Sequence, residues 1–309
     1  MKYLTIKDNL TISRIGYGCM RMAGLSVEKV ESLIETAFEE GINYFDHADI
    51  YGKGESERVF GEVLKRHPEW RKKMVLQTKC GICFGEHTNY YDFSKEHILN
   101  SVEASLQRLH TDYLDILLLH RPDTLMDPKE IAEAFDELYE SGKVKYFGVS
   151  NMNPMQIEFL KKHVKHPILF NQLNFNPVKT GMVDNQFFTN RMEKEAYDHD
   201  GSLLDYCRLH DITIQPWSVF LISSKEGSYL NNPKYEELNA MLDTYAKKYN
   251  VSKTAIVMAW ILRHPANMQP LFGSTNREHI KEMCAGVNVH LTREEWYNIY
   301  VKGLGRRLP

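Results

Sequence analysis

The sequence predicts an α/β protein built as a (β/α)8 barrel, the TIM barrel architecture. Eight short apolar runs alternate with longer segments of helical periodicity, at intervals of roughly 30 to 40 residues. Apolar strands that alternate with helices are typical of a parallel sheet covered on its outside by helices. An open doubly wound sheet usually carries a G-x-G-x-x-G turn after its first strand, whereas the run from Gly16 to Arg21 lacks the third glycine. We therefore expect a barrel.

The eight apolar runs are the expected barrel strands. In chain order they are residues 15–19, 42–45, 74–78, 114–119, 144–149, 168–173, 212–217 and 268–272. Before them, residues 3–6 and 10–13 flank Lys7-Asp8-Asn9, which predicts an N-terminal β-hairpin that caps one end of the barrel. After them, two extra C-terminal helices are expected, and the second opens with the capping box Thr292-Arg293-Glu294-Glu295.

The segments between the strands carry helix start and stop signals. Ser26 precedes an apolar pattern at helical spacing, and Gly41 closes that pattern as a left-handed C-cap would. The tetrapeptide Asp127-Pro128-Lys129-Glu130 supplies an N-cap, a first-turn proline and a capping-box acid, and Asn153-Pro154 begins another helix in the same way. Residues 176–200 are polar and carry no clear pattern, which is typical of a functional or mobile loop.

The composition excludes several classes of protein. The 309 residues are 43% hydrophobic and 26% charged with a formal net charge of −3, so neither disorder nor binding to nucleic acid or an acidic membrane is indicated. No linker divides the chain, and we expect one domain over residues 1–309. The absence of a signal-peptide or membrane-span pattern predicts a cytoplasmic protein. Five cysteines, an odd number, favour reduced thiols, and no metal site is expected.

Polar residues stand just past the expected strands, where catalytic groups of a barrel are found. Asp46 ends the second strand, Lys79 and His120 follow the third and fourth, and Tyr51 lies five residues beyond Asp46. A buried lysine needs a partner, and Asp46 is the obvious one. An ammonium beside a phenol stabilises the phenolate, so we expect the pKa of Tyr51 to fall from about 10. With His120 to bind the oxygen and hydride from a cofactor, these residues meet the requirements for reducing a carbonyl.

The same residues are also compatible with other interpretations. Asp46 and Lys79 alone would suit a structural ion pair, and Lys79 would suit a Schiff-base lyase, although a carboxylate partner raises a lysine pKa where a lyase needs it lowered. The run Cys80-Gly81-Ile82-Cys83 has the spacing of a redox dithiol or half a zinc site, but no second cysteine pair exists. Too few histidines lie at strand ends for a metal hydrolase.

Several motifs in order and spacing resemble the aldo-keto reductase superfamily along essentially the whole chain. They are Phe45-Asp46-His47-Ala48-Asp49-Ile50-Tyr51-Gly52, Thr78-Lys79-Cys80-Gly81, Leu119-His120-Arg121-Pro122-Asp123, Gly148-Val149-Ser150-Asn151 and Asn171-Gln172. Within that superfamily they look most like bacterial oxidoreductases of uncharacterised substrate. The resemblance implies a small-molecule aldehyde or ketone substrate, with Tyr51 as general acid, Lys79 and Asp46 as its tuners and His120 orienting the carbonyl.

The resemblance also implies a nicotinamide cofactor. The residues expected to bind it are Ser150, Asn151 and Gln172 at the carboxamide, Trp217 stacked on the ring, Ser218 at the pyrophosphate, Gly273 and Ser274 at the adenosine phosphate, and Glu282 near the adenine. NADP is favoured over NAD, although Gly273 and His279 replace the lysine and arginine that usually grip the 2′-phosphate. Arg277 and Lys281 could supply charge instead, and Met283 replaces an asparagine that contacts adenine.

The sequence leaves the substrate open. The expected rim of the substrate site includes Met20, Arg21, His47, residues 83–93, Phe187, Phe188 and the tail after Gly303. A monomer or weak homo-oligomer is expected. Two alternatives to a reductase stay open, namely a Schiff-base lyase that uses Lys79 and a cofactor-loaded regulatory subunit with little turnover.

Overall fold

The computed structural model describes residues 1–7 and 10–309 and confirms the (β/α)8 barrel. Its parallel strands are, in chain order, β3 (Gly16–Gly18), β4 (Tyr44–Asp46), β5 (Val75–Cys80), β8 (Leu114–Leu119), β9 (Val144–Ser150), β10 (Ile168–Asn174), β11 (Thr213–Trp217) and β14 (Leu271–Phe272). Each pairs with the next from β3 to β11, and β14 pairs with β3. Gln269 N donates to Ile214 O at 3.0 Å, which joins β11 to the approach to β14.

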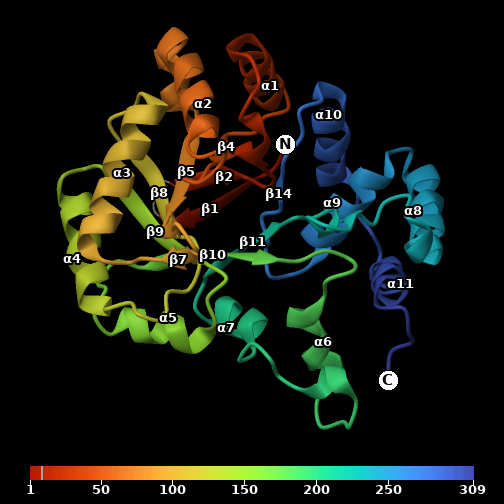
Figure 1. Ribbon diagram of the computed structural model, residues 1–309. Coiled ribbons are helices and arrows are strands. Elements are labelled where there is room, and N and C mark those ends of the chain that lie inside the picture. The colour runs from red at the N-terminus through yellow and green to blue at the C-terminus, as the bar shows by residue number, and fades with distance from the viewer. Residues whose placement is uncertain (8–9) are drawn as a thin grey trace.

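Helices cover the outside of this sheet (Figure 1). They are α1 (Val27–Glu39), α2 (Glu55–Arg66), α3 (Lys95–Leu109), α4 (Pro128–Glu140), α5 (Pro154–Lys161), α7 (Leu203–Leu209), α8 (Glu236–Tyr249), α9 (Lys253–Arg263), α10 (Arg277–Ala285) and α11 (Arg293–Leu304). Apolar side chains of the helices and the outer strand faces form one large buried core between the two layers. All eight predicted apolar runs thus became strands, and the last two helices are the extra C-terminal pair. No helix in the described ranges has the length and apolar character needed to cross a membrane.

The predicted helix ends are confirmed with one exception. The Ser26 side chain accepts a hydrogen bond from Lys29 N, and Gly41 has a positive φ of 78°. Capping boxes form at Asn153 and at Thr292. At α4, however, Asp127 accepts from Lys129 N at 2.9 Å, so its side chain binds the residue before the predicted capping-box position.

The predicted N-terminal hairpin is present as β1 (Tyr3–Lys7) and β2 (Leu10–Ser13), which pair antiparallel. Its expected turn includes residues 8–9, which lie outside the described residues. Leu10 and Ile12 are buried together with Tyr44, Phe170 and other inward-facing strand residues. Because Tyr44 begins β4, the hairpin closes the N-terminal end of the barrel and leaves the C-terminal end open for a site.

Long connections lie at that open end. β5 is followed by a hairpin of β6 (Ile82–Phe84) and β7 (Asn89–Tyr91), and β11 by β12 (Leu221–Ser223) and β13 (Gly227–Ser228). The polar segment 176–200 contains helix α6 (Gly181–Phe187), which projects away from the strands (Figure 1). Asn176 anchors this segment, because its side-chain amide donates to the carbonyls of Ser218 and Leu221 at 2.9 and 3.0 Å.

Candidate active site

Four polar side chains from separate strand ends meet at the C-terminal end of the barrel. Asp46 is the last residue of β4, Lys79 lies in β5, His120 follows β8, and Tyr51 lies in the turn before α2. Lys79 Nζ is 2.7 Å from Asp46 Oδ1 and donates to Tyr51 Oη at 3.1 Å. The rings of Tyr51 and His120 meet edge to face, with centroids 6.1 Å apart. The structure thus brings together the four residues that the sequence singled out.

Lys79 is fully buried, and its ammonium is held from several sides. Besides Asp46 and Tyr51, it donates to the backbone carbonyl of His47 at 2.7 Å. Burial alone would lower the pKa of Lys79, but the Asp46 carboxylate and the Tyr51 oxygen outweigh it, and the pKa is raised. A lysine held in its charged form is a poor nucleophile, so this geometry opposes a Schiff-base lyase.

The environment of Tyr51 corrects one expectation. The charge of Lys79 does lower the pKa of the phenol, as expected from the sequence, but burial acts in the opposite direction and is the larger effect. The pKa of Tyr51 is therefore raised, not lowered, and the hydroxyl keeps its proton near neutral pH. Since Lys79 donates to this oxygen, the Tyr51 hydroxyl proton is free to point elsewhere.

His120 is held as a neutral imidazole. Burial, and then the positive charges of Lys79 and Arg121, lower its pKa well below the ordinary value. Its backbone N–H donates to Cys80 O at 2.9 Å, and its Nδ1 is buried without a hydrogen-bond partner among the described residues. A neutral ring beside Tyr51 can donate one N–H to an oxygen without adding a charge.

A buried amide network beneath the tetrad had not been predicted from the sequence. Asp46 Oδ1 accepts from the amides of Gln77 at 2.6 Å and Gln172 at 3.1 Å. The network continues through Gln215 to Gln269, with Tyr44 bridging Gln77 and Gln215. A glutamine inside an apolar strand is a usable signal, since a buried amide needs partners. These donors hold Asp46 in position and satisfy its charge.

A second buried ionic group supports the turn that carries Tyr51. Glu57 of α2 is fully buried, where it accepts from Thr78 Oγ1 at 2.6 Å and pairs with Arg108 at 2.7 Å. Burial, and then the charge of Glu57, raise the pKa of the nearby Asp49 carboxyl to about 7. His47 packs against Phe60 of α2 with ring centroids 4.5 Å apart and is fully buried, so it does not belong to the expected substrate rim.

The residues expected at the nicotinamide also cluster at the barrel mouth. Ser150 Oγ donates to Gln172 O at 3.0 Å, and the Asn151 amide donates to Ser150 Oγ at 2.7 Å. Trp217 Nε1 donates to Asn151 Oδ1 at 3.3 Å. The amide nitrogen of Gln172 is already used by Asp46 and Gln215, so its oxygen is the atom left to meet a ligand. Asn151 and Ser218 both have positive φ, 58° and 53°, which fixes the loop ends at this mouth.

A cavity of about 710 Å³ adjoins Asn151 and Trp217 and reaches under segment 176–200. Arg121, Lys179 and Lys194 line it and form no ion pair with any carboxylate of the described chain. The acids in its lining are bound by neighbours: Asp184 accepts from Tyr300, Glu195 pairs with Arg306, and Asp200 accepts from Leu203 N. The cavity therefore places three cations that lack a carboxylate partner near the Asn151 and Trp217 pair, together with carboxylates that are already held by other groups.

The residues expected at the adenosine end do not form one cluster. Tyr17 Oη donates to Ser274 O, which fixes the loop after β14. Arg277 turns away toward α1, where it donates to Thr36 Oγ1 at 2.6 Å and lies 3.7 Å from Glu39. His279 and Glu282 lie exposed on α10, and Met283 is buried in the core. At Gly273 a Cβ atom would lie 2.9 Å from Gly18 O, so a longer side chain does not fit without backbone movement.

Comparison with known proteins decides the family. The model of the Aldo/keto reductase family matches residues 14–301. The chain belongs to this family. It is 34% identical to the uncharacterized oxidoreductase YcsN of Bacillus subtilis (strain 168) and 33% identical to a 6-dehydroglucose reductase of Agrobacterium fabrum, each over the full length of both chains. It is 33% identical to the oxidoreductase YdhF of Escherichia coli (strain K12), covering 96% of this chain and 94% of that one.

The crystal structure of a thermostable aldo-keto reductase with the inhibitor epalrestat has the same fold. It superposes with a TM-score of 0.77 at 24% identity and covers 98% of this chain and 100% of its own. The family and these relatives identify the protein as an oxidoreductase that acts on carbonyl groups.

The rim of this aldo-keto reductase differs from the expected one in two further places. Phe188 is 2% exposed and lies under the Arg306 guanidinium, 4.3 Å from it. Phe187 packs against Tyr297 and Tyr300 of α11. Phe187 ties segment 176–200 to α11, and Phe188 ties it to the residues that follow α11, so neither ring faces a substrate. Large exposed apolar side chains do remain at Met20, Phe84, Tyr90 and Tyr91.

Proposed function

We propose that this protein reduces an aldehyde or ketone to an alcohol, with hydride from a reduced nicotinamide cofactor and a proton from Tyr51. The observation that carries the proposal is the contact of Tyr51 Oη with Lys79 Nζ, 3.1 Å apart, while Lys79 is held 2.7 Å from Asp46. A phenol that must give up its proton needs a cation in this position, because the cation stabilises the phenolate left behind.

Each residue of the tetrad has a separate task in this proposal. His120, as a neutral ring, donates a hydrogen bond to the carbonyl oxygen and fixes it beside Tyr51. Tyr51 transfers its proton to that oxygen as negative charge develops there. Lys79 stabilises the resulting phenolate, and Asp46 keeps Lys79 charged and in place. The reverse reaction, oxidation of an alcohol, uses the same residues with Tyr51 as base.

The groups at the barrel mouth fit a nicotinamide dinucleotide. Ser150, Asn151 and Gln172 present amide and hydroxyl groups of the kind that hold a carboxamide, and the partly exposed Trp217 offers a ring face beside them. The unpaired charges of Arg121, Lys179 and Lys194 suit an anionic pyrophosphate in the adjoining cavity. When bound, the cofactor supplies the hydride that the protein's own side chains cannot.

We propose NADP in preference to NAD, with a 2′-phosphate grip that is weaker than the family pattern implies. The supporting groups are the exposed His279 and Lys281 on the first turns of α10, where Lys281 also pairs with Glu278, together with the positive end of the helix dipole. Gly273 cannot contribute a charge, and Arg277 is engaged by Thr36 and Glu39.

The decisive experiment is Tyr51→Phe. We expect kcat for carbonyl reduction to fall by about 10²-fold or more, since general acid catalysis supplies roughly that factor. The affinity for NADPH, measured by quenching of protein fluorescence, should stay within about twofold because the phenol does not touch the Ser150 and Trp217 group. Tyr139→Phe, on the exposed face of α4, is the matched control. A Tyr51→Phe variant with unchanged kcat would reject the proton-donor role.

A further inference from the structure

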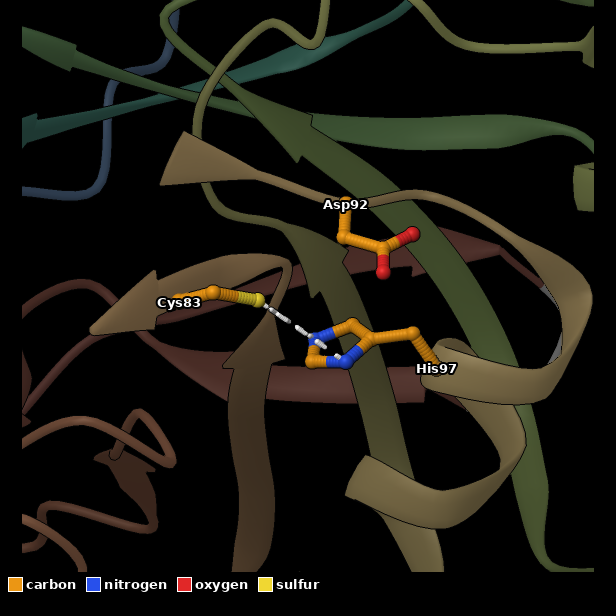
Figure 2. Close-up of side chains that lie close together, drawn as sticks. All are labelled: Cys83, Asp92 and His97. Atoms are coloured by element: carbon orange, nitrogen blue, oxygen red, sulfur yellow. Dashed lines mark hydrogen bonds between the residues drawn. The ribbon is translucent and has the colours of Figure 1, made fainter. Parts of the chain in front are cut away.

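Three side chains that the proposed reaction does not use converge beside the barrel mouth: Cys83, Asp92 and His97. Cys83 lies in β6, Asp92 directly follows β7, and His97 is in the first turn of α3. Figure 2 shows all three side chains pointing toward one another, with the thiol directed at the imidazole ring. Their potential ligand atoms lie within 4.8 Å of one another.

We propose that Cys83, Asp92 and His97 bind a divalent transition-metal ion, best matched by Zn²⁺, as three protein ligands with a fourth position open to water. A thiolate, an imidazole and a carboxylate are all ligand types that Zn²⁺ accepts. With only one carboxylate, the site lacks the many oxygen ligands that Ca²⁺ or Mg²⁺ requires. The inference is independent of the tetrad and of the cofactor.

The distances are close to those of a tetrahedral site. Cys83 Sγ lies 3.9 Å from His97 Nδ1 and 3.7 Å from Nε2. Two ligands at zinc–sulfur and zinc–nitrogen distances of about 2.3 and 2.0 Å, held at the tetrahedral angle, are about 3.5 Å apart. Small side-chain rotations therefore suffice to bring the sulfur, nitrogen and oxygen atoms into coordination range.

The backbone around the three ligands is already fixed. Asp92 N donates to Gly81 O at 3.0 Å across the base of the hairpin, and Phe93 N donates to Asp123 Oδ2 at 3.1 Å. Ser94 caps α3 by accepting from His97 N. A preformed arrangement lowers the ordering cost of binding a metal. The ion would in turn tie the β6–β7 hairpin, with its exposed Phe84, Tyr90 and Tyr91 side chains, to α3.

Neighbouring groups suit each ligand to its task. Ser101 Oγ lies 3.3 Å from His97 Nε2, one turn along α3, so Nδ1 can serve as the metal ligand while Nε2–H is held. Ser94 N donates to Asp92 Oδ1 at 2.8 Å, which orients the carboxyl group of Asp92.

The Cys83 thiol is partly exposed at the hairpin, where a metal ion can reach it. A divalent ion bound there would displace the thiol proton, because the thiolate is the form that binds a metal.

Cobalt is the probe for this site, because a thiolate ligand gives Co²⁺ an intense near-ultraviolet charge-transfer band. The chelator-treated full-length protein is titrated with Co²⁺ and then with Zn²⁺. We expect one equivalent of Co²⁺ to produce the band and Zn²⁺ to remove it by displacement. Cys83→Ala should abolish the band, while the matched variant Cys80→Ala should keep it, because Cys80 is buried and is not one of the three converging groups.

Two further variants test the other ligands. His97→Ala and Asp92→Asn should each weaken Zn²⁺ binding about tenfold or more, and Asn keeps the acceptor for Ser94 N. His87→Ala, at the exposed turn of the β6–β7 hairpin, is the control and should bind Zn²⁺ with the same affinity as the parent. Circular dichroism checks that each variant is folded. The proposal is overturned if the parent gives no charge-transfer band, or if the band survives in a folded Cys83→Ala variant.

Discussion

Lys79 Nζ lies 2.7 Å from Asp46 Oδ1 inside the barrel, and the lysine side chain is fully buried. Two charges removed from water in this way carry a large desolvation penalty, which their attraction and the added hydrogen bonds must offset. Gln77, Gln172 and the carbonyl of His47 supply those hydrogen bonds. The Asp46 and Lys79 ion pair therefore contributes both to the stability of the fold and to the proposed catalysis.

Asp46→Asn should reveal this shared dependence. The change keeps the shape but leaves a buried ammonium without its counter-charge, which typically costs about 3 to 5 kcal/mol of unfolding free energy. Without Asp46 the buried Lys79 gives up its proton more readily, since burial lowers its pKa. A neutral Lys79 cannot stabilise a phenolate, so we also expect kcat to fall at least as far as in Tyr51→Phe. Urea unfolding and steady-state kinetics check both effects. Glu55→Gln, which breaks the exposed pair with Arg58, should change the unfolding free energy by less than about 1 kcal/mol.

Asp49 predicts a specific pH dependence of stability. Its pKa is raised to about 7 in the folded protein by burial and Glu57, from an ordinary value of 3.8. The folded state thus holds a proton that the unfolded state has released, so this group stabilises the fold at low pH and loses that contribution as the pH rises toward 7. Asp49→Asn lacks this titration. Its unfolding free energy, relative to that of the parent, should therefore rise by up to about 4 kcal/mol between pH 4 and pH 8.

Chemical unfolding of both proteins across that pH range measures the difference. Asp112→Asn, which changes an exposed carboxyl next to β8, should show the same pH dependence of unfolding free energy as the parent. If the difference in unfolding free energy between Asp49→Asn and the parent is the same at every pH, the pKa of the Asp49 carboxyl is not raised.

Trp217→Ala should weaken cofactor binding. Loss of the ring face beside Asn151 is expected to raise the Kd for NADPH by about tenfold, or about 1.4 kcal/mol. Trp217→Phe retains a ring, so its Kd for NADPH should lie between those of Trp217→Ala and the parent. Calorimetry measures the affinities without relying on tryptophan fluorescence, and thermal unfolding confirms the fold. An unchanged Kd in Trp217→Ala would exclude stacking of the nicotinamide at this position. A parallel titration with NADH compares the affinities of the two cofactors.

Gly273→Ala should lower the unfolding free energy although the substitution adds only one methyl group. Its Cβ would lie 2.9 Å from Gly18 O, a backbone atom that can move only with β3. We expect a loss of about 1 to 3 kcal/mol in unfolding free energy. At Gly181 a Cβ meets nothing within 4 Å, so Gly181→Ala is the matched control and should be close to neutral. Equal stabilities of the two variants would show that the loop after β14 adapts freely.

The strands and the tetrad could be predicted because they follow from short-range rules. Apolar runs of strand length, such as residues 114–119, keep their character wherever they fold, and β8 spans that run. In a parallel barrel the strand ends meet at one face, so Asp46, Lys79 and His120 had to come together once the fold was known. The end of each helix follows equally from local hydrogen bonding, as at Ser26 and Thr292.

The expectations that proved wrong depended on burial and on long-range contacts. The sign of the Tyr51 pKa shift depends on how much protein surrounds the phenol, which no spacing reveals. Arg277 and Phe188 found partners in α1 and at Arg306, far away along the chain, and left the site expected for them.

Sequence alone determined the order of strands and helices, the barrel and the four residues at its mouth, because periodicity and strand-end position are local properties. Tertiary structure decided which polar groups meet across the fold. It joined Gln77, Gln172 and Gln215 beneath Asp46, and it brought together Cys83 of β6, Asp92 just after β7 and His97 of α3. Contacts of this kind depend on the packing of distant segments, and only the folded chain specifies that packing.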